Sequence, residues 1–342
     1  MRLELRKEVL AVTASRPVTL ADVARVAGVS TSTTSRVLNG GANVSASLRL
    51  RVLAVADALG YVSNMAAQAL RGRRRAVFTL VPDARTFPIA AQAASIEEAA
   101  RAEGVLASVV MIGRDTTARV SRIQALRTLK PHAIIVSYTE PEVATVGAEL
   151  QRFVDEGGHV VTMGEPKTGF PRVCHDDQTT VRLLGEHLLG LGRRRPAIVT
   201  DHGALRHRQE AMLACFADHG IDPATVPVVT VERDSIQASQ ATRRFITASD
   251  SCDLIYATND VLALGVMDAL TEMGVRIPED IAVAGHDDIP LSRDATPGLT
   301  TVALDFAAAG RAALAMALDD DPPAITCLAG RLVIRGSTAG AG

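Results

Sequence analysis

Tryptophan is absent from this sequence, and aromatic residues make up only 3% of its 342 residues. The core must therefore be mainly aliphatic, which suits an apolar fraction of 47%. Cysteine is also scarce: Cys174, Cys215, Cys252 and Cys327 stand far apart and form no CxxC pair. This spacing argues against a disulfide framework or a zinc site, and it indicates buried thiols in a reducing compartment.

Long apolar runs and enzyme signatures are missing as well. No segment approaches the roughly 18 apolar residues of a membrane span, and residues 1–16 mix charges in a way unlike a signal peptide. There is no GxGxxG, GxxxxGKS/T, GxSxG or HExxH motif. The sets His175, Asp176 and Asp177, or His202 and His207, lack convincing metal-ligand spacing. We therefore expect a cytoplasmic protein without membrane contact, catalytic residues, cofactor or metal.

Positive charge gathers near the N-terminus, although the whole chain has a formal net charge of −2. Between Arg16 and Arg75 nine arginines stand against two aspartates, a local excess of seven. A basic module on a mildly acidic body is typical of a protein that binds a polyanion such as nucleic acid. On charge alone, a basic face exposed to solvent would explain the pattern equally well.

Three short helices are predicted in this basic segment. Thr19 is a good N-cap for the first, and Gly28 permits a tight turn after it. Ser30 caps the second helix, and Ser45 caps a third that ends at Gly60. Two helices across a short turn, supported by a third, form the helix-turn-helix plan, whose second helix offers its N-terminal side chains to the DNA major groove.

The second helix begins with a row of small hydroxyl side chains. Thr34, Val37 and Leu38 are predicted to face the core, so that the outward positions are Thr31, Ser32, Thr33, Ser35 and Arg36. Small hydroxyls can approach DNA closely, and helix N-terminal amides favour phosphates. The pattern therefore favours a DNA-reading helix.

Residues 19–40, TLADVARVAGVSTSTTSRVLNG, closely resemble the DNA-binding headpiece of the lactose-repressor (LacI/GalR) family of bacterial transcription regulators. Residues 61–72, YVSNMAAQALRG, resemble that family's hinge helix, which forms when a dimer docks on its operator. The resemblance implies an N-terminal extension (1–15), a helix-turn-helix headpiece (16–60) and a hinge helix with linker (61–75). It assigns DNA contacts to Thr19, Ser30, Thr31, Ser32, Thr33, Ser35, Arg36, Asn39, Asn64, Ala67 and Leu70.

By the same resemblance, Thr31 and Ser32 are the main base readers, and Leu70 is the leucine wedged into the central base step of the operator. An ordinary buried leucine is the alternative for Leu70. Two departures from the family pattern stand out: Ser63 replaces a usual proline, and Thr34 replaces a usual valine. Ser63 makes the hinge start less rigid, and the Thr34 hydroxyl can bond back to the helix backbone.

From residue 76 onward, apolar strand-like runs alternate with helical segments. Strands are predicted within 76–83, 105–113, 132–138, 159–165, 195–201, 253–260 and 280–288. Continuous apolar strands separated by helices indicate doubly wound parallel sheets, an α/β fold in which ligands lie at the carboxyl ends of the strands.

The resemblance continues through this body and is most specific over residues 257–302. It implies the periplasmic-binding-protein-like fold, two similar α/β lobes joined by crossover strands that close on a small molecule. The effector-binding and dimerisation domain is expected to span 76–342. Its first lobe would hold about 76–172 and 302–325, and its second about 173–301 and 326–342.

Effector contacts are implied by the resemblance for Asp83, Phe87, Arg208, Asn259, Asp287 and Phe306. Carboxylate and amide oxygens accept from sugar hydroxyls, arginine offers a planar fork, and an aromatic face covers a ring. Loop caps or lobe–lobe salt bridges are the simpler explanation of each. His286 stands where the family usually has an aromatic residue. The effector is therefore either sugar-like or an anionic metabolite.

These observations predict a homodimeric regulator that binds a pseudo-palindromic double-stranded DNA operator, with repression as the expected outcome. No long leucine-rich tail follows residues 331–340, so a dimer is expected and not a tetramer. The alternative is a solute-binding or enzymatic two-lobed α/β protein with an incidental basic N-terminus. Whether the effector releases DNA or acts as a corepressor is open at this stage.

Overall fold

The computed structural model describes residues 18–38, 44–61, 75–82, 86–113, 115–137, 144–164, 169–202, 205–248 and 252–339. The chain divides into two compact units, Met1–Arg73 and Arg74–Gly342. Five predicted contacts lie outside the described residues, namely Asn39, Asn64, Ala67, Leu70 and Asp83. Most of the predicted hinge helix, including Ser63, lies outside them too.

Three helices form the described part of the first unit: α2 (Leu20–Ala27), α3 (Thr31–Leu38) and α4 (Ala46–Ala58). Thr19 begins α2 with a capping box, in which its backbone N–H donates to the Asp22 carboxylate at 3.0 Å. Gly28 ends the helix at φ 67°, a left-handed conformation that suits glycine. Val23 and Val52 are fully buried between the helices. The predicted caps and core face of this unit are confirmed.

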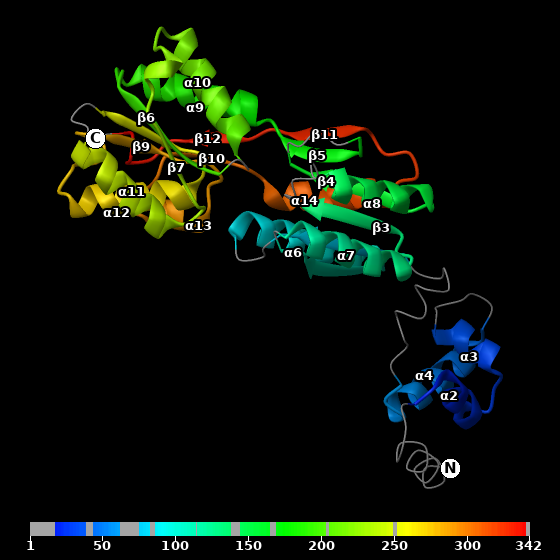
Figure 1. Ribbon diagram of the computed structural model, residues 1–342. Coiled ribbons are helices and arrows are strands. Elements are labelled where there is room, and N and C mark those ends of the chain that lie inside the picture. Colours follow the sequence, from blue (N-terminus) through cyan, green and yellow to red (C-terminus); the bar gives the residue numbers. More distant parts are fainter. Residues whose placement is uncertain are drawn as a thin grey trace. The chain divides into compact units, whose positions relative to one another are not determined.

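The second unit begins with a lobe built on a six-stranded sheet of order β11-β5-β4-β3-β1-β2 (Figure 1). Its strands are β1 (Ala76–Val81), β2 (Leu106–Met111), β3 (Ala133–Ser137), β4 (His159–Met163), β5 (Arg172–His175) and β11 (Ile325–Leu328). Its helices are α6 (Phe87–Ala102), α7 (Thr116–Thr128), α8 (Ala144–Asp155) and α14 (Phe306–Leu318). Every pairing described in this sheet is parallel.

Helices cover both faces of this sheet, because successive side chains of a strand point to opposite sides. On β3, Ala133 and Ile135 pack in one cluster with α6 and α14. Ile134 and Val136 pack on the other face with α7 and α8. All four side chains are buried, which explains the unbroken apolar run of this strand.

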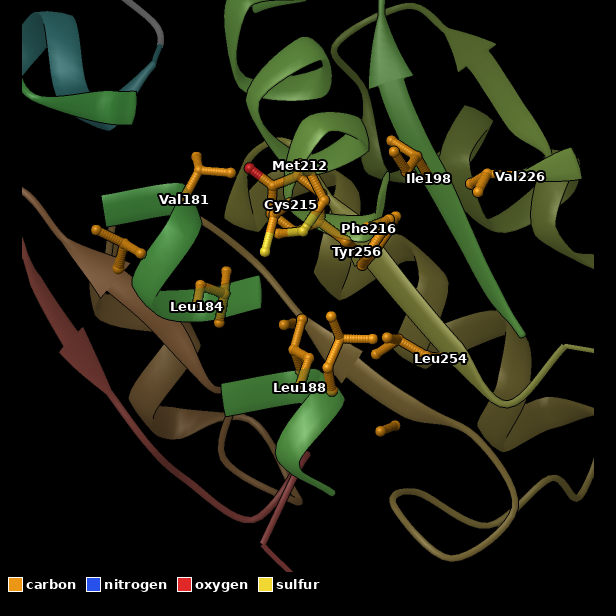
Figure 2. Packing of buried hydrophobic residues seen from close by; sticks show 14 of the residues in the cluster. Val181, Leu184, Leu188, Ile198, Met212, Cys215, Phe216, Val226, Leu254 and Tyr256 are labelled. Carbon is orange, nitrogen blue, oxygen red and sulfur yellow. The ribbon is translucent and has the colours of Figure 1, made fainter. Parts of the chain in front are cut away.

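The second lobe repeats this plan on a four-stranded parallel sheet of order β7-β6-β8-β9. Its elements are α9 (Asp177–Gly190), β6 (Pro196–Asp201), α10 (Arg206–Asp218), η1 (Pro223–Thr225), β7 (Val228–Val231), α11 (Ser235–Ala248), β8 (Leu254–Ala257), α12 (Asp260–Glu272), β9 (Ala282–Ala284), α13 (Pro290–Asp294), β10 (Thr301–Ala303) and β12 (Arg331–Val333). Figure 2 shows the cluster in which Leu184 and Leu188 of α9 meet Phe216 of α10 and the sheet residue Tyr256. The predicted doubly wound parallel sheets are confirmed.

Three segments of chain connect the two lobes. The first follows β5, the second lies between β10 and α14, and the third joins β11 to β12. The chain therefore crosses a few residues later than the positions near 172, 302 and 326 expected from the sequence. The reason is that β5 and β11 pair in register over their whole length, and the ladder ends only where Asp176 N–H donates to the Leu328 carbonyl at 2.9 Å.

Candidate functional sites

Helix α3 presents the row of hydroxyls that the sequence singled out. Thr31, Ser32 and Arg36 are exposed, whereas Thr34 is fully buried. The Ser30 hydroxyl accepts the Thr33 N–H at 3.1 Å and so caps the helix. The Thr34 hydroxyl donates to the Ser30 carbonyl at 3.1 Å, the backbone bond expected from its extra oxygen. The surface of α3 thus offers small polar groups, while its opposite face packs in the core of the head.

Not every hydroxyl assigned to DNA is equally available. Ser30 Oγ lies 2.8 Å from both Ser32 Oγ and Thr33 Oγ1, so the Ser30 hydroxyl already bonds to each of the other two. Thr19 donates its hydroxyl to Asp22 at 2.6 Å as part of the cap of α2. Thr31 and Arg36 are the exposed members of the row that these bonds do not involve.

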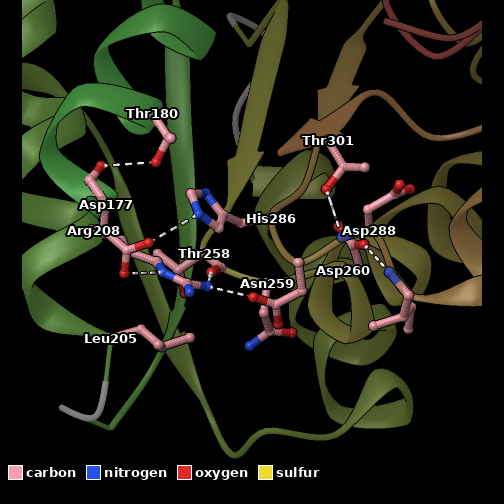
Figure 3. A network of polar contacts seen from close by, with 12 residues as sticks. Asp177, Thr180, Leu205, Arg208, Thr258, Asn259, Asp260, His286, Asp288 and Thr301 are labelled. Carbon is pink, nitrogen blue, oxygen red and sulfur yellow. Dashed lines mark hydrogen bonds and ion pairs between the residues drawn. The ribbon is translucent and has the colours of Figure 1, made fainter. Parts of the chain in front are cut away.

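In the body, Arg208 is the centre of a buried polar cluster (Figure 3). Its Nε donates to Asp177 Oδ2 at 2.9 Å, and its Nη1 donates to Asp287 Oδ1 at 2.8 Å and to the Thr258 carbonyl at 3.0 Å. Arg208 stands in the first turn of α10, while Asp177 begins α9 and Asp287 follows β9. The fold thus brings together three charged groups that are far apart in the sequence.

Two histidines complete the surroundings of Asp177. His207 Nε2 lies 2.7 Å from Asp177 Oδ2, and His286 Nε2 lies 3.2 Å from Oδ1. Burial alone would raise the pKa of Asp177, but Arg208 and the neighbouring imidazoles hold it well below its usual range. Burial and the Arg208 charge lower the pKa of His286. Asp177 is therefore an anion that several donors share.

Backbone strain marks the same place. Asp287 has φ 119° and Asp288 has φ 55°, values in the left-handed range that non-glycine residues rarely adopt. Asp288 is anchored by Arg335, whose Nη2 donates to its Oδ1 at 2.7 Å. Such strain persists where surrounding contacts over-determine the chain, and it clusters at functional sites.

Asn259, a predicted effector contact, and its neighbour Asp260 have different surroundings. Asn259 caps α12 by accepting the Leu262 N–H at 3.0 Å, and its buried Nδ2 has no hydrogen-bond partner among the described residues. Asp260 is fully enclosed: it accepts from the Ile289 N–H at 2.9 Å and from the Ser292 and Thr301 hydroxyls at 2.6 Å. Asp260 thus supports the loop through these three hydrogen bonds.

Aromatic side chains from the first lobe gather beside this cluster. Phe306, the first residue of α14, packs edge-on against Phe87 with ring centroids 6.4 Å apart. It also packs edge-on against His175 at 5.5 Å. Phe306 is buried, whereas Phe87 is 43% exposed. The structure therefore brings the two predicted aromatic residues together.

A cavity of about 450 Å³ lies between the lobes on the side of β5 and β11. Asp177 and His207 form part of its wall, but Arg208, Asn259, Asp287 and Phe306 do not. Asp177 and His207 were absent from the predicted effector contacts. Asp177 comes soon after the end of β5, and His207 lies at the start of α10 after a loop. Polar residues at such positions are a signal of a site in α/β folds. The described residues contain no group of three histidine, cysteine or carboxylate side chains suited to a metal ion.

The described chain thus combines a DNA-binding helix-turn-helix motif with an α/β body whose strand ends can hold a small ligand. Two family models match the chain: bacterial regulatory proteins of the lacI family over residues 19–64, and the periplasmic binding protein-like domain over residues 186–338. The ribose operon repressor of Halalkalibacterium halodurans is 31% identical over 83% of this chain and 84% of its own length. The chain therefore belongs to the lacI family and is a DNA-binding transcriptional regulator.

Solved structures agree with this membership. A crystal structure of the Lac repressor dimer bound to operator and the anti-inducer ONPF matches with a TM-score of 0.85 at 26% identity, covering 94% of this chain and 99% of that one. A LacI family regulator from Arthrobacter sp. FB24 in complex with lactose matches with a TM-score of 0.68 at 26% identity, covering 78% and 100%. The predicted family and fold are confirmed, while the individual DNA and effector contacts stay predictions. None of the described helices is long and apolar enough to cross a membrane.

Proposed function

We propose that this regulator binds a pseudo-palindromic operator as a homodimer in the cytoplasm and represses transcription under the control of a small effector. The observation that carries the proposal is the joining of an exposed hydroxyl row on α3 to a body with a buried, strained polar cluster. The Lac repressor of similar fold was solved as an operator-bound dimer, which supports the same assembly here.

For the DNA half, Thr31 and Arg36 are the foremost base and phosphate contacts, with Ser32 beside them. Thr31 is exposed at the first position of α3 and Arg36 in its last turn, which fits a helix whose N-terminal end enters the major groove while its other end lies near the phosphates. Thr19, Ser30, Thr33 and Ser35 serve as supporting contacts. The hinge contacts Asn64, Ala67 and Leu70 rest on the resemblance of residues 61–72 alone.

For the effector half, the charges favour a neutral, hydroxyl-rich ligand over an anion. Arg208 is already matched by Asp177 and Asp287, so the buried cluster holds one positive and two negative charges. Burial lowers the pKa of His286 and of His175, so neither is a ready source of positive charge. Carboxylates and an amide donor suit sugar hydroxyls. The lactose complex of the Arthrobacter regulator supports this class.

We assign no catalytic step to this cluster. Asp177 and Asp287 are both ion-paired with Arg208, and the lowered pKa of Asp177 makes it a poor proton acceptor. The named relatives are regulators, which supports binding as the role of the site.

The first test is selection of random duplex DNA on the full chain, repeated with Thr31→Ala and with Ser47→Ala. Ser47 is an exposed hydroxyl of α4, outside the reading helix. We expect a two-fold symmetric consensus and a loss of discrimination at one base step for Thr31→Ala, about 1–3 kcal/mol for a good base contact. Ser47→Ala should keep the wild-type consensus. An asymmetric consensus, or identical preferences for both variants, would contradict the assignment.

The second test measures thermal stabilisation of the full chain by neutral mono- and disaccharides and by the matching sugar acids. We expect a rise in Tm with a neutral sugar, lost in Asp287→Asn and kept in Asp294→Asn. Asparagine tolerates the positive φ of position 287, and Asp294 is an exposed carboxylate of α13. Stabilisation by sugar acids alone would overturn the charge argument.

A further inference from the structure

Two cysteines lie opposite each other on neighbouring strands of the first lobe. The ladder of β5 and β11 places Cys174 directly beside Cys327 in parallel register. Side chains of registered residues point to the same face, and neighbouring strands are about 4.8 Å apart. That spacing falls within the range of roughly 4.4–6.8 Å that Cα atoms of a disulfide span. The pair is invisible in the sequence, where the two residues are widely separated.

This pair occupies the segments that join the lobes. Strand β5 leads through Asp176 into α9, whose first residue Asp177 holds Arg208. Strand β11 leads into β12 of the second lobe. Figure 1 shows both strands running from the first lobe toward the second. A covalent link between them would fix two of the three connecting segments relative to each other.

Cys327 is the accessible member of the pair, whereas Cys174 is buried. Both line the cavity of about 450 Å³ between the lobes, and Cys327 is exposed to solvent. The two other cysteines differ: burial raises the pKa of Cys215, and it raises the pKa of Cys252 to about 11. Because the thiolate is the reactive form, Cys215 and Cys252 are poor nucleophiles and serve as internal controls.

We propose that Cys174 and Cys327 form a reversible thiol pair that a hydroperoxide oxidises to a disulfide. The Cys327 thiolate attacks one peroxide oxygen, the O–O bond breaks, and the departing oxygen takes up a proton to leave as water or alcohol. The resulting sulfenic acid is attacked by Cys174; the S–S bond forms, and hydroxide leaves and takes up the Cys174 thiol proton. The peroxide gains two electrons, and the two thiols lose them.

The geometry makes this bond labile. A disulfide needs Cβ atoms about 3.5–4.5 Å apart, slightly closer than the spacing of the ladder. Strained or exposed disulfides are the readily reduced, regulatory ones. Resting on the function proposed above, oxidation would hold the lobes in one relative position and so reduce the change that an effector produces at the operator.

The cross-link itself is tested without DNA or effector. The full chain is treated with hydrogen peroxide, its free thiols are counted in denaturant, and its peptides are mapped without reduction. We expect two of the four thiols to disappear, a Cys174–Cys327 peptide pair to appear, and dithiothreitol to restore all four. Cys215→Ser and Cys252→Ser should behave like the wild type in forming this pair. Four remaining thiols, or a disulfide to any other cysteine or between chains, would overturn the proposal.

Two variants keep the test independent of folding. Cys327→Ser changes an exposed residue, and Cys174→Ala replaces a buried thiol with a small apolar group. Neither should form the peptide pair, and Cys174→Ala should accumulate a Cys327 sulfenic acid that dimedone traps. Hydrogen exchange at residues 172–177 and 325–328 should slow on oxidation of the wild type and stay unchanged in Cys327→Ser. Equal slowing of hydrogen exchange in the wild type and in Cys327→Ser would refute the proposal that the disulfide holds these segments. Failure of these experiments leaves the consensus selection untouched, so the two proposals can fail separately.

Discussion

Arg208 is the residue whose removal should change this protein most. The residue is 3% exposed, and its guanidinium bonds to Asp177 and Asp287. Replacing it with methionine keeps much of the volume but leaves Asp177, itself buried, without its main counter-charge. Breaking a buried ion pair from one side costs about 3–5 kcal/mol. For a body of this size, 1 kcal/mol moves Tm by roughly 2–4 °C, so Arg208→Met should lower Tm by about 6–20 °C.

The assay is heat and urea unfolding followed by far-ultraviolet circular dichroism, since the chain has no tryptophan to report on the body. Arg276→Met is the matched control, because Arg276 is exposed and its ion pair among the described residues is with Asp280, four positions along the chain. We expect its transition to overlay that of the wild type, as is usual for surface pairs.

A double-mutant cycle isolates the pair. Asp177→Asn removes the stranded charge, so Arg208→Met with Asp177→Asn should cost at least about 1 kcal/mol less than the sum of the single changes. Strict additivity, or a single-variant loss no larger than that of Arg276→Met, would refute the reasoning. The melting curves also give the temperature below which the Arg208 variants stay folded. Below that temperature, loss of an effector response reports on binding and not on unfolding.

Three further outcomes follow from single positions. Gly265 of α12 lies so close to α11 that a Cβ would overlap a backbone carbonyl, so Gly265→Ala should destabilise the protein by about 1–3 kcal/mol. Gly190 has open space around it, so Gly190→Ala should not destabilise the protein. Equal melting curves for the two variants would contradict this. Burial raises the pKa of Asp260 from 3.8 to about 6. The stabilising protonated form is thus fully populated below about pH 4 and lost as pH rises through 6. The unfolding free energy of the wild type, relative to that of Asp260→Asn, should therefore fall on the order of 3 kcal/mol between pH 4 and 7. A difference between the two proteins that does not change with pH would disprove the pKa shift. Thr34→Val removes a hydroxyl whose partner among the described residues is the Ser30 carbonyl, so the head should lose about 1 kcal/mol or less with its DNA consensus unchanged. An altered consensus would mean that Thr34 reaches the DNA.

The local features of the head could be read from the sequence because their causes are local. Thr19, Ser30 and Ser45 cap helices through bonds to residues three positions away. Gly28 adopts the left-handed turn that its position after an apolar helix predicts. Burial of Thr34 and Val37 follows from helical spacing. Each of these depends on a few consecutive residues, so the sequence contains the whole cause.

In the body, the sequence determined the alternation of strands and helices and hence the parallel sheets, since two-sided burial requires unbroken apolar strands. Asn259 and Asp287 stand where predicted strands end, and the family resemblance added Arg208, which lies in the first turn of α10. The sequence missed Asp177, because the four-residue strand before it, β5, is too short to stand out as a periodic pattern.

Only the tertiary structure decided which polar groups meet. The pairing of Arg208 with Asp177 and Asp287 requires α9, α10 and the loop after β9 to converge, which depends on strand order and not on spacing along the chain. The same holds for Cys174 and Cys327, which are neighbours because β11 returns to pair with β5 in register. Sequence periodicity fixes which face of an element is buried, but the register between distant strands is set by the packing of the whole sheet.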